Sequence, residues 1–131
     1  MILASGATLG LISVVFGAFA EHSLRENISA EHFRFLMTAV RYNQVHAVVV
    51  TAIGLSMLNG STSLAAYVIK LSSLLFLIGT ILFSFSIYLS VWLGIPLLLS
   101  VTPVGGVTIM LAWVTLVFAG IYGLGKQNGS R

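Results

Sequence analysis

The charged side chains of this 131-residue chain are confined almost entirely to one short segment. All three carboxylates, all three histidines and half of the basic residues lie between Glu21 and His46. Outside this segment the charged residues are Lys70, Lys126 and Arg131. A water-soluble domain carries charge over its whole surface, at about a quarter of its residues, whereas 7% of this chain is charged and its mean hydropathy is +1.07. We therefore expect an integral membrane protein with one polar segment.

The apolar segments are long enough for several membrane crossings. A hydrocarbon core about 30 Å thick requires roughly 20 apolar helical residues per crossing. We predict crossings at about residues 2–20, 40–58, 71–93 and 104–124, which leave little chain for a soluble domain. The expected fold is all-α: a single membrane domain, residues 1–131, built as an integral membrane four-helix bundle with up-down-up-down topology.

The polar segment before the second crossing is predicted to be an interfacial amphipathic extension of that helix. Phe33, Met37 and Val40 form an apolar stripe opposite Arg34 and Arg41, as in a helix lying at a membrane surface.

Local signals predict where several helices begin. Ser29 is typical of a helix N-cap. Lys70 is expected at the entrance to the third crossing, where its side chain can reach the interface. Thr102 is predicted to cap the last helix, with Pro103 in its first position.

Small residues recur on one face of the first predicted crossing. They are Gly6, Gly10, Ser13 and Gly17. Helices in lipid gain little from the hydrophobic effect against one another, and small residues let their backbones approach closely. We therefore predict that this face packs against another helix, with a partner protein or a second copy as the expected neighbour.

The composition excludes several functional classes. The chain has no cysteine, which rules out disulfides and thiolate chemistry, and its net charge of +3 is too small and dispersed for a nucleic-acid surface. We find no Ser-His-Asp arrangement, metal-ligand cluster or phosphate-binding loop, so we expect neither an enzyme nor a bound metal or cofactor. No predicted crossing contains a carboxylate away from its ends, which disfavours a proton-driven antiporter.

Four segments of the chain resemble a known family of small membrane proteins. They are residues 17–22 (GAFAEH), 39–47 (AVRYNQVHA), 82–88 (LFSFSIY) and 101–106 (VTPVGG), the last followed by Trp113. Together they resemble the domain-of-unknown-function family 423, also called uncharacterised protein family 0382, over about residues 3–124. The resemblance implies a four-span inner-membrane or plasma-membrane protein and implies no reaction. This chain departs from the family pattern at Ala20-Glu21, Arg41 and Phe85.

An up-down-up-down bundle brings these four segments to one membrane face. The topology therefore predicts a single shallow site for an anionic group such as a lipid phosphate, with a cation, imidazoles and backbone amides around it. The candidate ligand-binding or lipid-binding residues are His22, Arg41, Tyr42, His46, Tyr88, Thr102, Gly105 and Gly106.

Two other interpretations of these residues remain open. In the structural one, Arg41 pairs with Glu21, His46 hydrogen-bonds a neighbouring helix, and Gly105 and Gly106 permit tight packing. In the other, His22 and the histidine at position 46 lie at one depth and ligate a haem iron.

The functional expectation is a small multi-pass membrane protein without catalytic activity. We expect it to act as a structural or accessory subunit that packs with itself or with larger membrane partners. The alternative is binding or transport of an anionic lipid or small molecule at a site in one leaflet. We expect it in the inner (plasma) membrane with both termini cytoplasmic, although Lys and Arg residues are equally divided between the two predicted sides.

Overall fold

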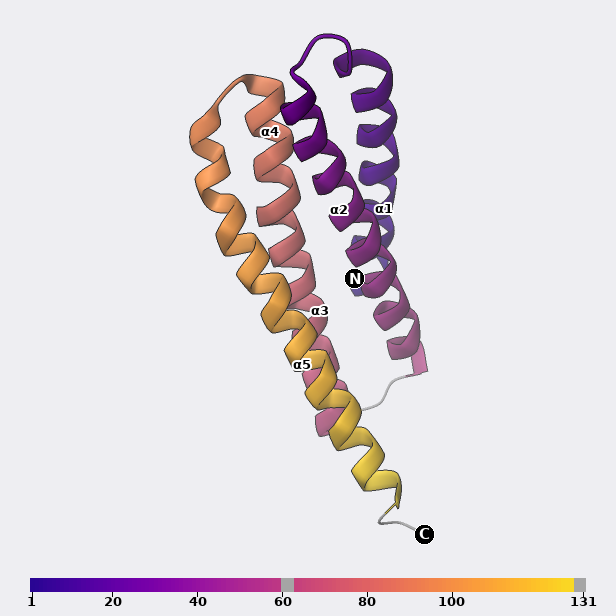
Figure 1. Cartoon of the computed structure of the whole chain (residues 1–131). Coiled ribbons are helices and arrows are strands. Elements are labelled where there is room, and N and C mark those ends of the chain that lie inside the picture. Colours follow the sequence, from indigo (N-terminus) through magenta and orange to yellow (C-terminus); the bar gives the residue numbers. More distant parts are fainter. Residues whose placement is uncertain (60–62, 129–131) are drawn as a thin grey trace.

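The protein folds into four long helical rods that lie side by side (Figure 1). The computed structural model describes residues 1–59 and 63–128, without the side chains of Asn59 and of residues 123–128, and the described part contains no strand. The elements are α1 (Ile2–Phe19), η1 (Ala20–Leu24), α2 (Ala30–Ser56), η2 (Met57–Asn59), α3 (Leu64–Thr80), η3 (Ile81–Phe85), α4 (Ser86–Leu93), η4 (Pro96–Val101) and α5 (Thr102–Asn128). The expected all-α fold is confirmed.

Two of the rods contain a π-helical turn. η1 continues α1 at its C-terminal end, and η3 joins α3 to α4 in one rod. Each inserts wider i→i+5 hydrogen bonding into a helix, an arrangement that occurs frequently at functional sites. Both turns overlap segments that carry the family resemblance.

The rods form two closely packed pairs. α1 packs mainly on α2, and α3 packs mainly on α5. A Cβ atom at Gly6 would lie 2.6 Å from the backbone nitrogen of Thr51, and one at Gly105 would lie 2.3 Å from that of Phe83. Since both neighbouring atoms are backbone, only glycine fits at these two crossings.

Three rods are long and apolar enough to cross a membrane. They comprise Ile2–Leu24, Leu64–Leu93 and Pro96–Tyr122. α2 is not among them, because the middle of its sequence carries Arg41, Asn43, Gln44 and His46. The predicted crossing at 40–58 therefore stays a prediction.

Several helix boundaries differ from the sequence prediction. Ser29 does cap α2, its hydroxyl accepting a hydrogen bond from the His32 amide. α3 begins at Leu64, so Lys70 lies inside the helix. Its place at the entrance to the third crossing stays a prediction. The prediction that Thr102 is an N-cap is wrong, since its backbone is already helical and the 3₁₀ segment η4 runs directly into it.

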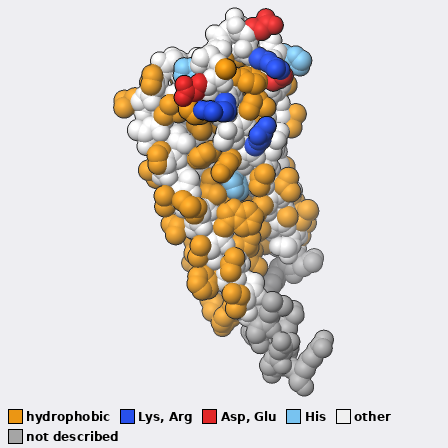
Figure 2. Space-filling view, viewed as in Figure 1, with side chains coloured by type: hydrophobic (Ala, Val, Ile, Leu, Met, Phe, Trp, Pro, Cys, Tyr) orange, Lys and Arg blue, Asp and Glu red, His pale blue; other side chains and the backbone are white. Residues whose placement is uncertain are grey.

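The charged residues between Glu21 and Arg41 lie toward one end of the bundle, whereas Lys70 lies on α3. On the face shown in Figure 2, the Arg and Glu side chains lie toward the end where α1 is joined to α2, and hydrophobic side chains cover much of the rest. Farther from this end, the core is a dry cluster around Phe76. Its other buried members are Val50, Ile53, Ile109 and Ala112.

Candidate functional site

Three of the predicted site residues line one cavity beside α2. Arg41, Tyr42 and His46 surround a volume of about 310 Å³ together with Val45 and Trp113. The first four lie on one stretch of α2, and Trp113 reaches the cavity from α5. Its size matches the lower end of small-molecule pockets, and its lining combines one cation with mostly aromatic and apolar walls.

His46 forms the buried wall of this cavity. Its ring stacks on Phe76, with 5.4 Å between ring centroids, and lies 6.3 Å from Trp113. The residue is 3% exposed, and its Nδ1 has no hydrogen-bond partner among the residues described. The carbonyl of Tyr42, one turn earlier, interacts electrostatically with the imidazole without the geometry of a hydrogen bond. A buried polar atom therefore adjoins the cavity.

Arg41 has no counterion within the described part of the chain. It is exposed, and the carboxylate of Glu21 pairs instead with Arg25, one turn away in sequence. The interpretation in which Arg41 pairs with Glu21 is therefore wrong. The same interpretation has His46 bonded to a neighbouring helix, and no such hydrogen bond is present among the described residues.

Tyr88 is buried on the opposite side of α2. It is 2% exposed, stacks on Phe16 at a centroid distance of 4.0 Å, and accepts a 3.4 Å hydrogen bond from the Nδ2 of Asn43. It does not line the Arg41 cavity. Tyr88 thus joins α1, α2 and α4 within the bundle.

The start of α5 lines a second cavity, of about 500 Å³. Thr102 and Gly106 contribute to it, and Phe83 forms another part of its wall. The Thr102 hydroxyl also lies 2.7 Å from that of Ser86. A Cβ atom at Gly106 would meet only the Phe83 side chain, at 3.8 Å, so tight packing is required at Gly105 and not here.

His22 lies apart from both cavities. It is exposed, in the π-helical turn that ends α1. The Gly6–Thr51 and Gly17–Val40 contacts fix the antiparallel register of α1 and α2. Extending this register places His22 eleven residues from the level of His46, about 16 Å along the helix axis. The assumption that both histidines lie at one depth is wrong, and they do not share a haem iron in this fold.

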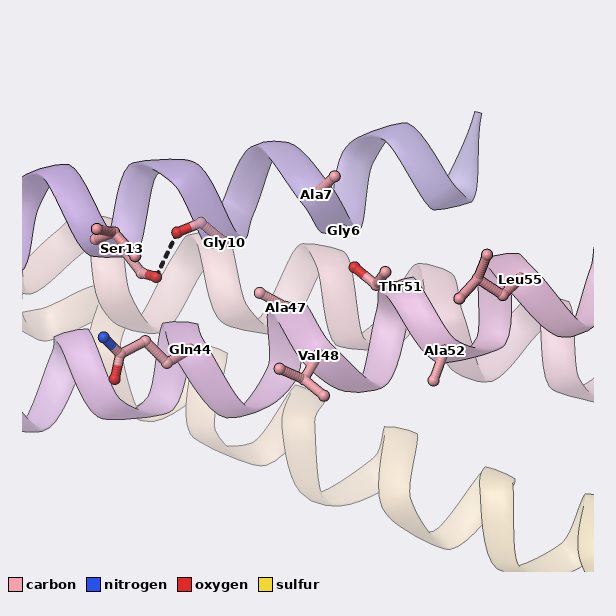
Figure 3. A pocket seen from close by; sticks show the side chains of 11 residues that line it. Gly6, Ala7, Gly10, Ser13, Gln44, Ala47, Val48, Thr51, Ala52 and Leu55 are labelled. Carbon is pink, nitrogen blue, oxygen red and sulfur yellow. Dashed lines mark hydrogen bonds between the residues drawn. The ribbon is translucent and has the colours of Figure 1, made fainter.

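The small residues of α1 face α2 of the same chain. Gly6, Gly10 and Gly17 all point toward α2, and the Ser13 hydroxyl bonds internally to the carbonyl of Gly10 (Figure 3). Outside this contact, α1 and α2 border an apolar groove of about 510 Å³. Its lining includes Ala7, Val14, Gln44, Val48, Ala52 and Leu55.

Sequence reasoning missed two phenylalanines of α3 and η3. Phe76 supports His46, and Phe83 stacks on Tyr42 at 4.6 Å while packing against the start of α5. They are seven residues apart, and this spacing on one helix face is the signal that predicts a shared role. Trp113 contacts Phe76 edge to face at 4.9 Å and also borders the Arg41 cavity.

The candidate metal ligands do not converge. Within residues 1–59 and 63–128, no group of three or more His, Cys, Asp or Glu side chains is arranged to hold a metal ion.

Comparison with known proteins identifies the relatives of this chain. A family model described as "Protein of unknown function (DUF423)" matches residues 16–106. The chain is 30% identical over 112 residues to a UPF0382 membrane protein of Haemophilus influenzae, covering 86% of each chain. It is 31% identical over 118 residues to the UPF0382 membrane protein YwdK of Bacillus subtilis, covering 88% of this chain and 92% of that one.

The name of a further relative states the membrane in which that protein lies. The UPF0382 inner membrane protein YgdD of Escherichia coli is 30% identical over 115 residues, covering 88% of this chain and 85% of that one. No solved structure matches significantly. With its apolar helices and these relatives, the chain is a membrane protein and belongs to the uncharacterised DUF423 (UPF0382) family.

Proposed function

We propose that this protein is a non-catalytic membrane protein that binds an anionic phospholipid between α2 and α5. The observation that carries this proposal is the exposed Arg41 guanidinium, which has no ion pair in the described structure and borders the cavity of about 310 Å³. Arginine binds phosphate through strong charge-assisted hydrogen bonds. The phosphate of a lipid headgroup at this level therefore provides the negative charge that pairs with Arg41, which no carboxylate of the described structure provides.

The rest of the cavity suits the apolar part of a lipid. Val45 and Trp113 are both about half exposed, at 54% and 42%, on helix surfaces that face outward. Arg41 lies nearer to the charged end of the bundle than His46 does, since α2 runs away from that end. This order supports a phosphate at Arg41 with the glycerol and acyl carbons against Trp113.

The test compares two arginines on one face of α2. Arg34 and Arg41 are seven residues apart and both exposed, but only Arg41 borders the cavity. We would measure retention of phosphatidylglycerol and of phosphatidylethanolamine by native mass spectrometry for the wild type, Arg41→Gln and Arg34→Gln. Because a hydrogen bond to a charged group contributes about 1.5–3 kcal/mol, Arg41→Gln should weaken phosphatidylglycerol binding about tenfold or more. Arg34→Gln, with the same net charge, should not.

Two results would contradict this proposal. Equal losses for both variants would indicate general attraction between a cationic end and anionic lipid. Unchanged retention of phosphatidylglycerol in Arg41→Gln would show that Arg41 does not bind this lipid. Trp113→Ala should weaken binding of both lipids, since it removes a wall shared by their acyl chains.

A second candidate function is an accessory role through self-association, for which the α1–α2 groove is the specific observation. Ala7 and Ala52 line it, and the neighbouring Val14 and Val48 are 63% and 69% exposed. We propose that a helix of a second copy occupies it. Because the chain has no cysteine, a single Ala52→Cys substitution would report crosslinking without background. A monomer without crosslinks at every protein-to-lipid ratio would exclude this role.

We also propose that α2 crosses the membrane, giving four crossings with both termini cytoplasmic in the inner (plasma) membrane. α2 contacts α1 from the level of Gly17 and Val40 to that of Leu3 and Gly54. Since α1 is long and apolar enough to span, a helix packed along it covers the same depth. Burial of His46 and Asn43 inside the bundle lowers the cost of their polarity.

A further inference from the structure

Three buried polar atoms lack a hydrogen-bond partner within the described structure. They are Oδ1 of Asn43, Nδ1 of His46 and Oγ1 of Thr80. Asn43 and Thr80 are 0% exposed and His46 is 3% exposed. Native proteins satisfy the large majority of such atoms with protein groups or ordered water, and the need is strongest where no bulk water can reach them.

The helix register brings these three residues to one level of the α2–α3 interface. His46 contacts Phe76, and the Ser84 hydroxyl donates a 3.0 Å hydrogen bond to the carbonyl of Ala39. Thr80 lies midway between Phe76 and Ser84, at i+4 from the first, and therefore on the same face. Asn43 lies between Ala39 and His46 on α2. Thr80 and Asn43 consequently face each other between the His46–Phe76 contact and the Ser84–Ala39 hydrogen bond.

The three unpartnered atoms include an acceptor and two groups that either donate or accept, so a water molecule can form hydrogen bonds with them. The Asn43 amide nitrogen already donates to Tyr88, which leaves its oxygen as an acceptor. The Thr80 hydroxyl and the His46 Nδ1 each either donate or accept, depending on hydroxyl rotation and tautomer. A buried water typically makes about three hydrogen bonds, in both roles.

A cation fits this group less well. All carboxylates of the chain lie between Glu21 and Glu31, so none is available on α3, η3, α4 or α5. The nearest basic side chain in the sequence of α2, Arg41, is exposed and lines the cavity that His46 also borders, so its positive charge disfavours a cation nearby. Two neutral oxygens and one imidazole nitrogen compensate little of the hydration that a cation would lose.

We propose that Asn43, His46 and Thr80 bind ordered water in the interior of the bundle, beside the π-helical turn η3. The water enters from the Arg41 cavity, which His46 borders. It goes no farther along the bundle, because the cluster around Phe76 is apolar and buried. The site is a closed hydration pocket and not a conducting path, and it does not depend on the lipid-binding proposal.

Water-edited solid-state NMR of the wild-type protein in liposomes tests this site directly. Polarisation from water should reach the side chains of Asn43, His46 and Thr80 nearly as fast as that of exposed Ser29. Val50, which is 0% exposed in the dry cluster, should receive it slowly and serves as the control. If the three polar side chains build up as slowly as Val50, the pocket is dry and the proposal fails.

Thr80→Val provides an independent test, because valine keeps the shape and removes the hydroxyl. Loss of a water-bound hydroxyl should lower the thermal midpoint, whereas loss of an unpartnered one should raise it. An equal or higher midpoint would contradict the proposal. A thermal midpoint that rises in sodium chloride but not in choline chloride at the same ionic strength would indicate that the site binds a cation instead of water. This result would overturn the proposal. The NMR result decides the question even if the variant does not fold.

Discussion

Alanine at Gly105 should separate α5 from η3, whereas alanine at the next residue should not. A Cβ atom at Gly105 would lie 2.3 Å from the Phe83 nitrogen and 2.8 Å from the Leu82 carbonyl carbon. Ordinary contact requires at least about 3.4 Å, and backbone atoms cannot rotate away. The two helices must therefore part by about 1 Å, which forfeits a quarter to a half of the dispersion energy of each affected contact.

The size of the destabilisation follows from comparing two glycine-to-alanine substitutions in one helix, because the gain in helix propensity is the same in both. Gly105→Ala and Gly106→Ala both gain up to about 1 kcal/mol because alanine favours a helix. Only the first creates a clash, since a Cβ at Gly106 meets a phenylalanine side chain at 3.8 Å. Overpacking costs about 1–3 kcal/mol. The free energy of unfolding of Gly105→Ala should therefore be lower than that of Gly106→Ala by about this amount.

Steric-trap unfolding in bicelles measures this difference directly in a lipid environment. The pair of variants should also differ at the hydroxyl contact between Ser86 and Thr102, which lies one turn from Gly105 and should lengthen only when α5 moves. If the free energies of unfolding of the two variants lie within about 0.5 kcal/mol of each other, which is about a thirtieth to a tenth of a typical protein's whole stability, then α5 does not approach η3 as closely as described.

Three further predictions concern the other helix contacts and the topology. Gly6→Ala should be destabilising, because its Cβ would meet the backbone of Thr51 at 2.6 Å, while Gly120→Ala should be neutral or stabilising, because none of the described atoms outside its own helix backbone lies within 4 Å of the added Cβ; thermal unfolding in detergent compares them. Ser84→Ala should cost about 1 kcal/mol by breaking an interhelical hydrogen bond, and Ser100→Ala, whose bond is local and exposed, should change the thermal midpoint little. Reporter fusions should place both termini on one side of the membrane; opposite sides would rule out four crossings.

The sequence predicted the parts of this fold that depend on local chemistry. Ser29 caps α2 because its hydroxyl accepts a hydrogen bond from the His32 amide in the first turn of the same helix. This contact joins residues three positions apart, so the local sequence is enough to predict it. The charged end follows from the order of the residues along the chain. The turn after α4 likewise has a local cause, since Gly94 ends the helix in a left-handed conformation with φ of 67°.

The cavities depend on helix register, which the sequence alone does not specify. The predicted up-down-up-down topology groups His22 with Arg41 and His46, because each of them lies near one end of a predicted crossing. The close approach at Gly6 instead sets α1 against α2 so that His22 extends beyond the group. The π-helical turn η3 is likewise invisible to periodicity.

The two tight glycine crossings divide the molecule into two hairpins with different kinds of interface. Within each hairpin the backbones touch at these crossings. Between the hairpins lie contacts of α2 with the α3–α4 rod, namely the hydrogen bonds of Ala39 and Asn43 and the ring contact of His46 with Phe76. We therefore expect each hairpin to form before the two dock, and their docking would then enclose the proposed water site.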